Sequence, residues 1–372
     1  MGSYQGRFTK KAQLARQKNK GKNKKNIVLT VVVVILSLIL ALLIGGVVYY
    51  NNFLNKINRV NNAETLSSEE FEALLSTMSG AELAEDVLID TVPETLDVMG
   101  EDEETIGGDI INILLIGQDT RNANKKGLSD TMILVSVNTK TKKLVMTSFM
   151  RDLYVEIPSE KGGYYKYRIN SAYPVGGMEL LDATLEHNFG VEIDNNVEVD
   201  FSGFQNVVDA MGGVDIELTK AEAYYLNTDP SFGLGRWKLK AGLNHLNGEQ
   251  ALAYSRIRKI DDDFVRTSRQ RTVLNKLIEK VKTMSLTQIL ALAEEVIPLI
   301  TTDMTNAEIT EYILKLVPLL PELKVESLRI PLDGEYSGHN IGTAENPGYV
   351  FSCNLKTTRE RLRSVIGVEA AE

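Results

Sequence analysis

The sequence predicts an α/β fold in which a central mixed β-sheet is flanked by helices (an αβα arrangement), preceded by one N-terminal transmembrane helix. Short, β-branched apolar runs bounded by turn residues predict the first three core strands, at Ile113–Ile116, Met132–Val137 and Leu144–Met146. Strand and helix patterns then alternate, with strands at Asn196–Phe201 and Val214–Leu218 around one helix. This alternation favours a parallel or mixed sheet with helices on its faces.

The remaining elements follow from periodicity and turn residues. Helices are predicted at Met178–Asn188, after Ser202 as N-cap, at Phe264–Met284 and at Leu355–Ile366. Ala221–Gly242 is predicted to be an exposed loop that covers or lines a site, and Gly334–Gly348 a second loop.

The N-terminal region is predicted to be a membrane anchor. Residues 1–26 form a basic tail with nine Lys or Arg and no acidic residue, and residues 27–50 then carry no charge. Twenty-four uncharged residues are enough to cross a hydrocarbon core about 30 Å thick, and they exceed the usual apolar region of a cleaved signal peptide. The positive-inside rule keeps the tail cytoplasmic, so we expect a single-pass type II protein of the cell membrane whose body is extracytoplasmic.

The rest of the chain is acidic, with a net charge of −18 after the basic tail is removed from the total of −9. This negative net charge argues against nucleic-acid binding by the part of the chain that follows the basic tail. Residues 51–108 are predicted to be a stalk or a set of accessory helices packed on the body, and both alternatives stay open. The catalytic domain is predicted to span residues 109–372. One cysteine and three scattered histidines make a zinc site improbable.

Charged residues stand at or near the ends of the first three predicted strands. They are Asp119, Arg121, Asp130, Arg151 and Asp152. Charged groups gathered at strand ends often form ligand sites in α/β folds. The alternative is that these residues cap the strands and pair with one another.

A second group of arginines lies further along the chain. Arg256 and Arg258 are two residues apart, so both side chains share a face of an extended segment. Arg266 and Arg269 continue the apolar stripe of the predicted helix, so each needs an anionic partner near the core. That partner is either the acidic run Asp261–Asp263 or an anionic ligand, for which guanidinium groups are well suited.

The chain resembles the LytR-CpsA-Psr family of Gram-positive cell-wall ligases, most strongly over 109–284. The resemblance rests on an ordered set of segments: NILLIGQDTR, SDTM, SFMRDLYVEIP, RINSAY, VDFSGFQNVVDAMGGVDI, LNGEQALAYSRIR and DDFVRTSRQ. The chain departs from the family at Met150, where many members have proline, and at Gln118, where a small or apolar residue is usual.

The resemblance implies transfer of a glycopolymer from undecaprenyl diphosphate to a peptidoglycan hydroxyl, with release of undecaprenyl phosphate. It implies Mg²⁺, with Mn²⁺ as the alternative ion, held by Asp119 and Asp130, and catalytic roles for these residues and Arg151. The implied pyrophosphate arginines are Arg121, Arg151, Arg256, Arg258 and Arg266, to which the helix stripe adds Arg269. Asp152 is predicted to be either the base for the acceptor hydroxyl or a structural partner of an arginine. Hydrolysis of the same diphosphate, and lipid-diphosphate binding or regulation without catalysis, are the alternative functions.

Overall fold

The computed structural model describes residues 49–60, 109–118, 128–159, 162–232, 234–342 and 347–367. Ile57–Glu372 forms one compact unit, and Met1–Lys56 belongs to another, in which residues 49–54 are helical. The basic tail and all but the last two residues of the predicted anchor lie outside the described ranges. Within those ranges, no helix has the length and hydropathy of a membrane span.

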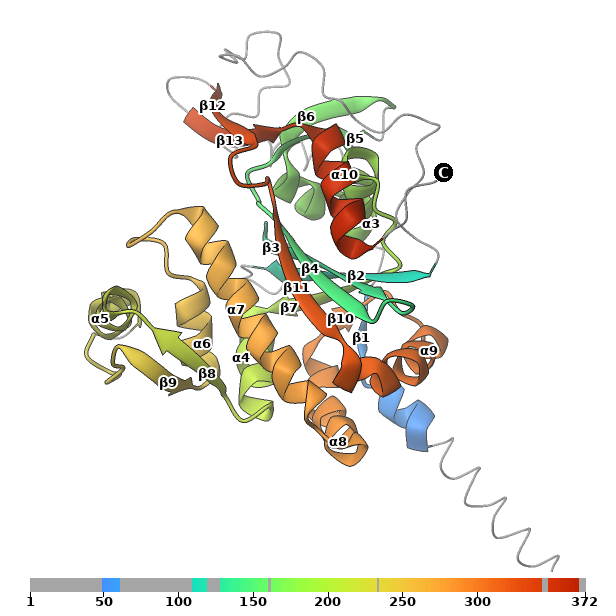
Figure 1. The fold of residues 1–372 in the computed structure, drawn as a ribbon, viewed down its shortest axis with the longest axis vertical. Helices are drawn as coiled ribbons and strands as arrows, with labels where there is room; N and C mark the ends of the chain where they lie inside the picture. The colour runs from blue at the N-terminus through green and yellow to red at the C-terminus, as the bar shows by residue number, and fades with distance from the viewer. Residues whose placement is uncertain are drawn as a thin grey trace, which may run out of the picture. The chain divides into compact units, whose positions relative to one another are not determined.

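A seven-stranded mixed sheet forms the centre of the larger unit (Figure 1). In spatial order its strands are β1 (Asn58–Arg59), β10 (Thr301–Thr302), β7 (Asn195–Asp200), β2 (Ile110–Gln118), β3 (Ser129–Asn138), β4 (Lys143–Phe149) and β11 (Lys324–Ile330). β2, β3 and β4 run antiparallel to their neighbours in that order, whereas β7 is parallel to β2 and β11 is parallel to β4. The predicted mixed sheet is therefore confirmed.

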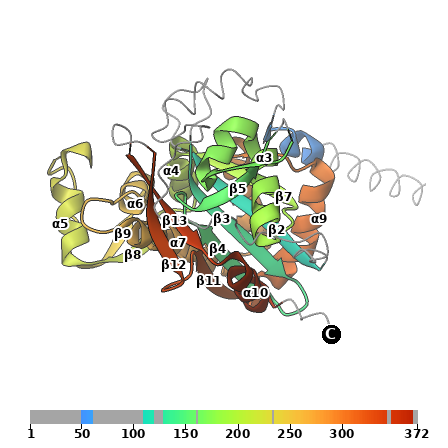
Figure 2. The same ribbon diagram turned by 90° about the horizontal axis from the view of Figure 1, so that it is seen from above.

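Helices cover both faces of this sheet, because its central strands are apolar on both sides (Figure 2). On β3, Met132 and Leu134 pack in one core with α3 (Ala172–Phe189) and α10 (Leu355–Ile366). Ile133 points to the opposite core, which contains residues of α7 (Asp263–Lys282) and α9 (Asn306–Leu316). The αβα layering is thus confirmed.

A second, smaller core lies beside the sheet. It is built from α4 (Phe201–Ala210), β8 (Val214–Leu218), α5 (Lys220–Thr228), β9 (Gly242–Leu246), α6 (Gly248–Ser255) and one face of α7. The strand expected at Val214–Leu218 exists but pairs with β9 in a separate two-stranded antiparallel sheet, not with the main sheet.

Three local predictions are corrected. The segment expected to be a loop from Ala221 begins with helix α5, because Thr219 and Glu222 form a reciprocal capping box at its start. The N-cap of α4 is Asp200 and not Ser202, since the Asp200 carboxylate accepts the Gly203 N–H at 2.6 Å. The loop expected at Gly334–Gly348 contains a hairpin, β12 (Tyr336–Gly342) with β13 (Pro347–Cys353).

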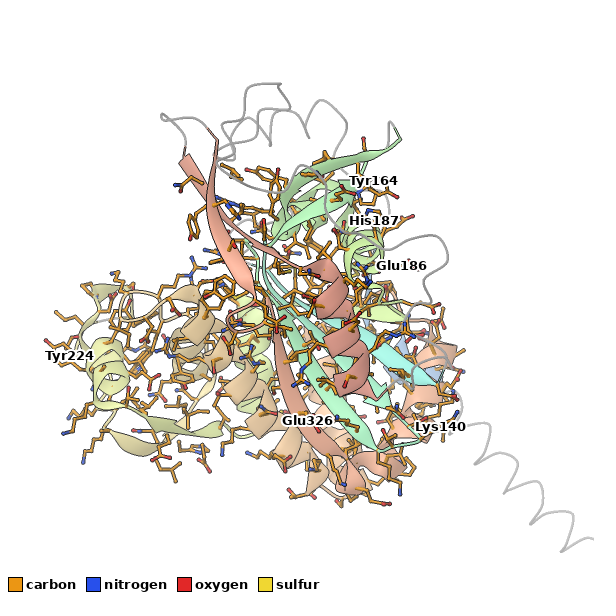
Figure 3. The ribbon with its side chains drawn as sticks, turned by 45° about the horizontal axis from the view of Figure 1, so that its top comes forward. Lys140, Tyr164, Glu186, His187, Tyr224 and Glu326 are labelled. Carbon is orange, nitrogen blue, oxygen red and sulfur yellow. The ribbon has the colours of Figure 1, made fainter. Side chains whose placement is uncertain are left out.

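The remaining elements are a hairpin and a helix. The hairpin, β5 (Tyr154–Pro158) with β6 (Tyr164–Arg168), lies against α3, where Tyr164 stacks on His187 with ring centroids 3.9 Å apart (Figure 3). Helix α8 (Leu286–Val296) precedes β10. At the edge of the sheet opposite β11, β1 pairs in parallel with β10.

The half-buried carboxyl group of Asp182 joins α3 to the sheet. The side-chain amide of Asn196 donates to Asp182 at 2.7 Å and to Asp303 at 2.8 Å. Burial raises the pKa of Asp182 to about 8, and the negative charge of Asp303 adds to this effect. Because the pKa is higher in the folded chain, the stability that protonated Asp182 contributes is complete below about pH 4 and is lost as the pH rises to about 8.

Asp182→Asn is therefore expected to remove part of the pH dependence of stability. Between pH 5 and pH 7.5, the free energy of unfolding of the wild type should fall by up to about 1.4 kcal/mol per pH unit more than that of the variant. Urea unfolding followed by the fluorescence of the single tryptophan measures both slopes. Glu217→Gln, which removes an exposed carboxylate on β8, is the control and should keep the wild-type slope.

Candidate functional site

The topology brings charged residues from distant segments to one edge of the sheet. Because β2, β3 and β4 alternate in direction, the end of β2, the start of β3 and the end of β4 lie together. Gln118 is opposite Ser129, and Met132 is opposite Phe149. Asp130 and Arg151 therefore project at the same edge.

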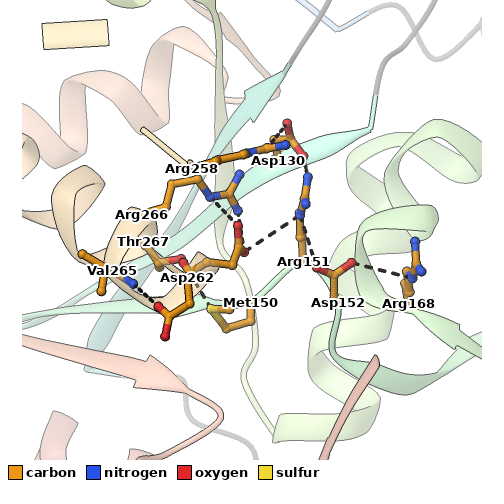
Figure 4. Close-up of polar contacts among 11 residues, drawn as sticks. Asp130, Met150, Arg151, Asp152, Arg168, Arg258, Asp262, Val265, Arg266 and Thr267 are labelled. Carbon is orange, nitrogen blue, oxygen red and sulfur yellow. Dashed lines mark hydrogen bonds and ion pairs between the residues drawn. The ribbon is translucent and has the colours of Figure 1, made fainter. Parts of the chain in front are cut away.

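Asp130 is held by two arginines (Figure 4). Its Oδ1 accepts from Arg151 Nη1 at 2.7 Å, and its Oδ2 accepts from Arg258 Nη2 at 3.0 Å. Burial alone would raise the pKa of Asp130, but the positive charges of Arg151 and Arg258 outweigh it and hold the pKa below its usual value. Asp130 is consequently a fixed anion at neutral pH.

Arg151 is the centre of the site. Its Nε donates to Asp152 Oδ2 at 3.3 Å and lies 3.9 Å from Asp263 Oδ2. Burial lowers the pKa of Arg151, but the three surrounding carboxylates raise it above its ordinary value. On the far side of Asp152, Arg168 Nε lies 3.6 Å from Oδ1.

Arg266 is the most buried cation of the group, with 3% of its surface exposed. Its Nη2 donates to Asp263 Oδ2 at 2.8 Å. Burial lowers the pKa of Arg266, Asp263 opposes this shift, and the positive charges of Arg151 and Arg258 lower the pKa further. Arg266 thus lies in an environment that still favours additional negative charge.

Backbone and side-chain contacts fix these groups relative to one another. The Met150 N–H donates to Ile330 O at 2.9 Å, and the Thr267 hydroxyl contacts Met150 Sδ at 3.4 Å. This contact sets α7, which carries Arg266, against the end of β4. The Ile169 N–H donates to Leu153 O at 2.8 Å, which holds Arg168 beside Asp152.

In this network of ion pairs, arginines alternate with aspartates, and we call it the arginine cluster. It contains four arginines and three aspartates of the described chain: Arg151, Arg168, Arg258, Arg266, Asp130, Asp152 and Asp263. The three carboxylates are about one-fifth exposed, so water screens them only in part. Among the described residues of this network, one positive charge is left without a balancing carboxylate, and the group is suited to an anionic ligand with several oxygen acceptors.

Two other predicted site residues, Arg256 and Arg269, lie outside this network. Arg256 stacks over the Phe201 ring at 4.2 Å from its centroid. Arg269 Nε donates to Glu222 Oε1 at 2.7 Å, and its Nη2 is paired with Asp261. The buried stripe position predicted for Arg269 is confirmed, but its partners are the chain's own carboxylates. Asp119 and Arg121 lie outside the described residues.

Sequence reasoning missed two members of the arginine cluster. Arg168 opens the RINSAY segment, which had marked the family resemblance without suggesting a role for its arginine. Asp263 had been considered only as a partner of the stripe arginines, whereas it lies between Arg266 and Arg151. The hairpin register that places Arg168 opposite Tyr154 could not be read from local patterns.

The carboxylate oxygens of Asp130 are suitable ligands for a hard divalent cation. Both of its oxygens accept one arginine N–H each, and a carboxylate oxygen has a second lone pair. Among the described residues, no group of three or more His, Cys, Asp or Glu side chains is arranged to hold a metal ion. A site at Asp130 would therefore need ligands from outside the described ranges, from water or from the substrate.

The LytR_cpsA_psr family profile matches residues 86–351, which is more than half of the chain. The chain belongs to this family.

Two curated relatives within the LytR-CpsA-Psr family carry transferase names. The polyisoprenyl-teichoic acid–peptidoglycan teichoic acid transferase TagV of Bacillus subtilis is 33% identical over 261 residues, covering 68% of this chain and 63% of that protein. The corresponding TagU of Bacillus cereus is 39% identical over 177 residues, covering 47% and 54%. The chain therefore spans less than two thirds of the length of these relatives.

A solved structure of the family shows the same fold. It is the LytR-CPS2A-psr family protein YwtF (TagT) with bound octaprenyl pyrophosphate lipid, at a TM-score of 0.52 and 27% identity. The match covers 72% of this chain and 95% of that one.

Removing Asp263 should lower the free energy of unfolding more than removing its partner Arg266. Asp263→Asn is expected to lower the free energy of unfolding by about 3 kcal/mol, because it leaves Arg266 buried without its anion. Arg266→Met is expected to change it by less than about 1 kcal/mol, because the remaining carboxylate is partly exposed and still faces Arg151.

Urea unfolding of both variants measures this difference in stability.

Unfolding in the presence of inorganic pyrophosphate tests anion binding at the arginine cluster. Pyrophosphate should stabilise the wild type against unfolding, and Arg266→Met should lose most of that stabilisation. Equal destabilisation by both substitutions would contradict the charge balance derived above.

Proposed function

We propose that the chain is a membrane-anchored phosphotransferase that moves a glycopolymer from undecaprenyl diphosphate to a peptidoglycan hydroxyl. The observation that carries this proposal is the excess of arginine over carboxylate in the arginine cluster, with Arg266 buried and under-neutralised. A diphosphate ester supplies both the missing negative charge and several acceptor oxygens. The names of TagV and TagU, and the octaprenyl pyrophosphate bound by TagT, support the same substrate class.

The proposed reaction exchanges one phosphate ester bond for another. The acceptor hydroxyl oxygen attacks the sugar-side phosphorus, and the bond from that phosphorus to the bridging oxygen breaks. Undecaprenyl phosphate leaves with the bridging oxygen, the hydroxyl proton is lost to water, and a phosphodiester joins glycopolymer to peptidoglycan. The leaving group is a phosphate, so it needs no acid, and stabilisation of charge on the phosphoryl oxygens is the main requirement.

Each residue of the cluster has a distinct part in this proposal. Arg151 lies at the centre and binds the phosphoryl oxygens, with Arg258 at the exposed side and Arg266 at the buried side. Asp152, placed between Arg151 and Arg168, positions Arg151 and is not the base. Of the two roles considered for Asp152, these contacts support positioning.

Mg²⁺ belongs to the proposal as a cofactor, with Mn²⁺ as a substitute. Asp130 would supply one ligand, and Asp119, which follows the end of β2, would supply another. When bound, the ion neutralises phosphate charge as a Lewis acid. The uncharged run at 27–50 would anchor the domain at the outer face of the membrane, where both the lipid carrier and peptidoglycan are found.

Arg151→Ala is expected to abolish transfer of labelled glycopolymer from its prenyl diphosphate carrier to peptidoglycan, with a loss of at least a hundredfold in kcat/KM. Asp152→Asn should retain measurable transfer, because Arg151 keeps its bond to Asp130. Arg361→Ala removes an exposed arginine on α10 and is the control for nonspecific charge effects.

Three results would overturn parts of this proposal. Full transfer by a folded Arg151→Ala variant would remove Arg151 from the site. Release of free glycopolymer phosphate at the same rate with and without acceptor would identify a hydrolase. Binding of prenyl diphosphate without turnover in the presence of any acceptor would identify a lipid-diphosphate-binding protein.

A further inference from the structure

The β12–β13 hairpin carries aromatic side chains on the face that is open to solvent. Strand alternation places Ile341 and Val350 on the other face, where both are buried in the main core. The open face carries Tyr336, Tyr349 and Phe351, and in the described part of the chain the two tyrosines are 37% and 50% exposed. Because the open face of an antiparallel pair usually carries polar residues, exposed aromatic residues there indicate a binding surface.

These rings form a continuous surface with Phe264 of α7, which we call the aromatic face. Phe351 contacts Phe264, Tyr336 and Tyr349, with ring centroids 5.1 Å, 5.5 Å and 5.4 Å apart. Tyr349 lies across Gly338 of the neighbouring strand, where a Cβ would overlap its hydroxyl group. The Tyr349 ring is therefore held against the hairpin while half of its surface stays open to water.

The aromatic face touches the arginine cluster at two points. The Phe351 N–H donates to the Asp152 carbonyl oxygen at 2.9 Å. Phe264 directly follows Asp263, whose carboxylate belongs to the cluster. A ligand on the aromatic face can therefore reach a phosphoryl group that is bound at the arginine cluster.

Two arginines beside the aromatic face have little negative charge near them. Arg329 Cζ lies 4.1 Å from the centroid of the Phe264 ring, and its guanidinium group pairs with Asp333, which is almost fully exposed. Arg271 follows Phe264 on α7 by about two turns. Burial lowers the pKa of Arg271 to about 10, and the positive charge of Arg329 adds to this effect. Arg271 Nη1 is buried and has no hydrogen-bond partner among the described residues, so the pair can accept a further carboxylate or phosphate group.

These features fit a glycan that carries carboxylate groups. The C–H face of a sugar ring packs on exposed aromatic rings, and carboxylate substituents would bind Arg271 and Arg329. A prenyl chain fits poorly, because it would take water from these guanidinium groups without replacing their hydrogen bonds. Among the substrates of the proposed transfer, peptidoglycan combines sugar rings with the carboxylates of its stem peptides.

We infer that the aromatic face binds the glycan strand of the peptidoglycan acceptor and directs one of its hydroxyl groups toward the arginine cluster. This inference rests on the proposed transfer, for which it supplies the acceptor surface.

The chain offers matched variants for a test. Tyr349→Leu removes a ring of the aromatic face, and its control is Tyr224→Leu, which removes a tyrosine that is 71% exposed on the outer side of α5 (Figure 3). Arg271→Gln removes a positive charge beside the aromatic face, and its control is Lys276→Gln, which removes an exposed cation of the same helix.

The experiment measures transfer by the full chain in detergent micelles, from a prenyl-diphosphate-linked disaccharide to soluble peptidoglycan strands. Tyr349→Leu and Arg271→Gln should each raise KM for the strands about tenfold, the change expected from loss of one such contact, with kcat and KM for the donor nearly unchanged. Both control variants should match the wild type.

Strands with amidated carboxylates separate the two contacts. Amidation should raise KM about tenfold for the wild type and for Tyr349→Leu, and should have much less effect on Arg271→Gln, which has already lost the charge that the carboxylate binds. Equal effects of amidation on the wild type and Arg271→Gln would contradict this assignment of Arg271.

An unchanged KM for the strands in either variant, with an active wild type, would overturn the inference. Urea unfolding and sedimentation of Tyr349→Leu then identify the occupant of the aromatic face. A lower urea midpoint would assign the face to another part of the chain, and loss of a dimer would assign it to a second copy.

If the wild type transfers nothing, the proposed function has failed, and calorimetric titration of the strands into the full chain tests the aromatic face alone. Binding that Tyr349→Leu and Arg271→Gln each weaken about tenfold would support the surface without the transfer. Equal affinity in the wild type and either variant, or no binding by the wild type, would overturn it.

Discussion

The site depends on one electrostatic constraint, which is that four guanidinium groups share three carboxylates at a partly buried edge of the sheet. Each aspartate lies between two arginines, so the cations are held apart at fixed positions without being fully neutralised. Arg266 is buried deepest, and the charges of Arg151 and Arg258 lower its pKa. Such a cluster is prepared for an anion before binding, so little reorganisation is needed when charge develops on a phosphoryl group.

The fold supplies this constraint through two packed layers. The antiparallel β2–β4 meander delivers Asp130 and Arg151 to one edge, and α7 packs on the sheet through its apolar face and carries Arg266 to the same place. The smaller core beside the sheet then brings Arg258 from the opposite direction.

Much of this arrangement could be predicted from the sequence, because it depends on local periodicity. The β2–β4 strands, α10 and the buried positions of Arg266 and Arg269 follow from apolar spacing. What could not be predicted depends on long-range partners: the pairing of Arg269 with Glu222 across α5, and the approach of Arg168 to Asp152. The separate two-stranded β8–β9 sheet was missed because strand periodicity is the same in either sheet. Helix α5 was missed because the Gly and Pro residues that follow it favoured a loop, although Thr219 and Glu222 form a capping box at its start.

The most direct test of the central claim is a crystal structure of the chain with octaprenyl diphosphate bound. The charge balance predicts phosphate oxygens within hydrogen-bond distance of the Arg151 and Arg266 guanidinium groups. The terminal phosphate, which would carry the sugar in the full donor, should be directed toward Arg258. A diphosphate bound elsewhere, with the bonds of Arg151 and Arg258 to Asp130 unchanged and no phosphate oxygen near Arg266, would contradict it. In that case the arginine cluster would be a structural network whose excess charge serves no ligand.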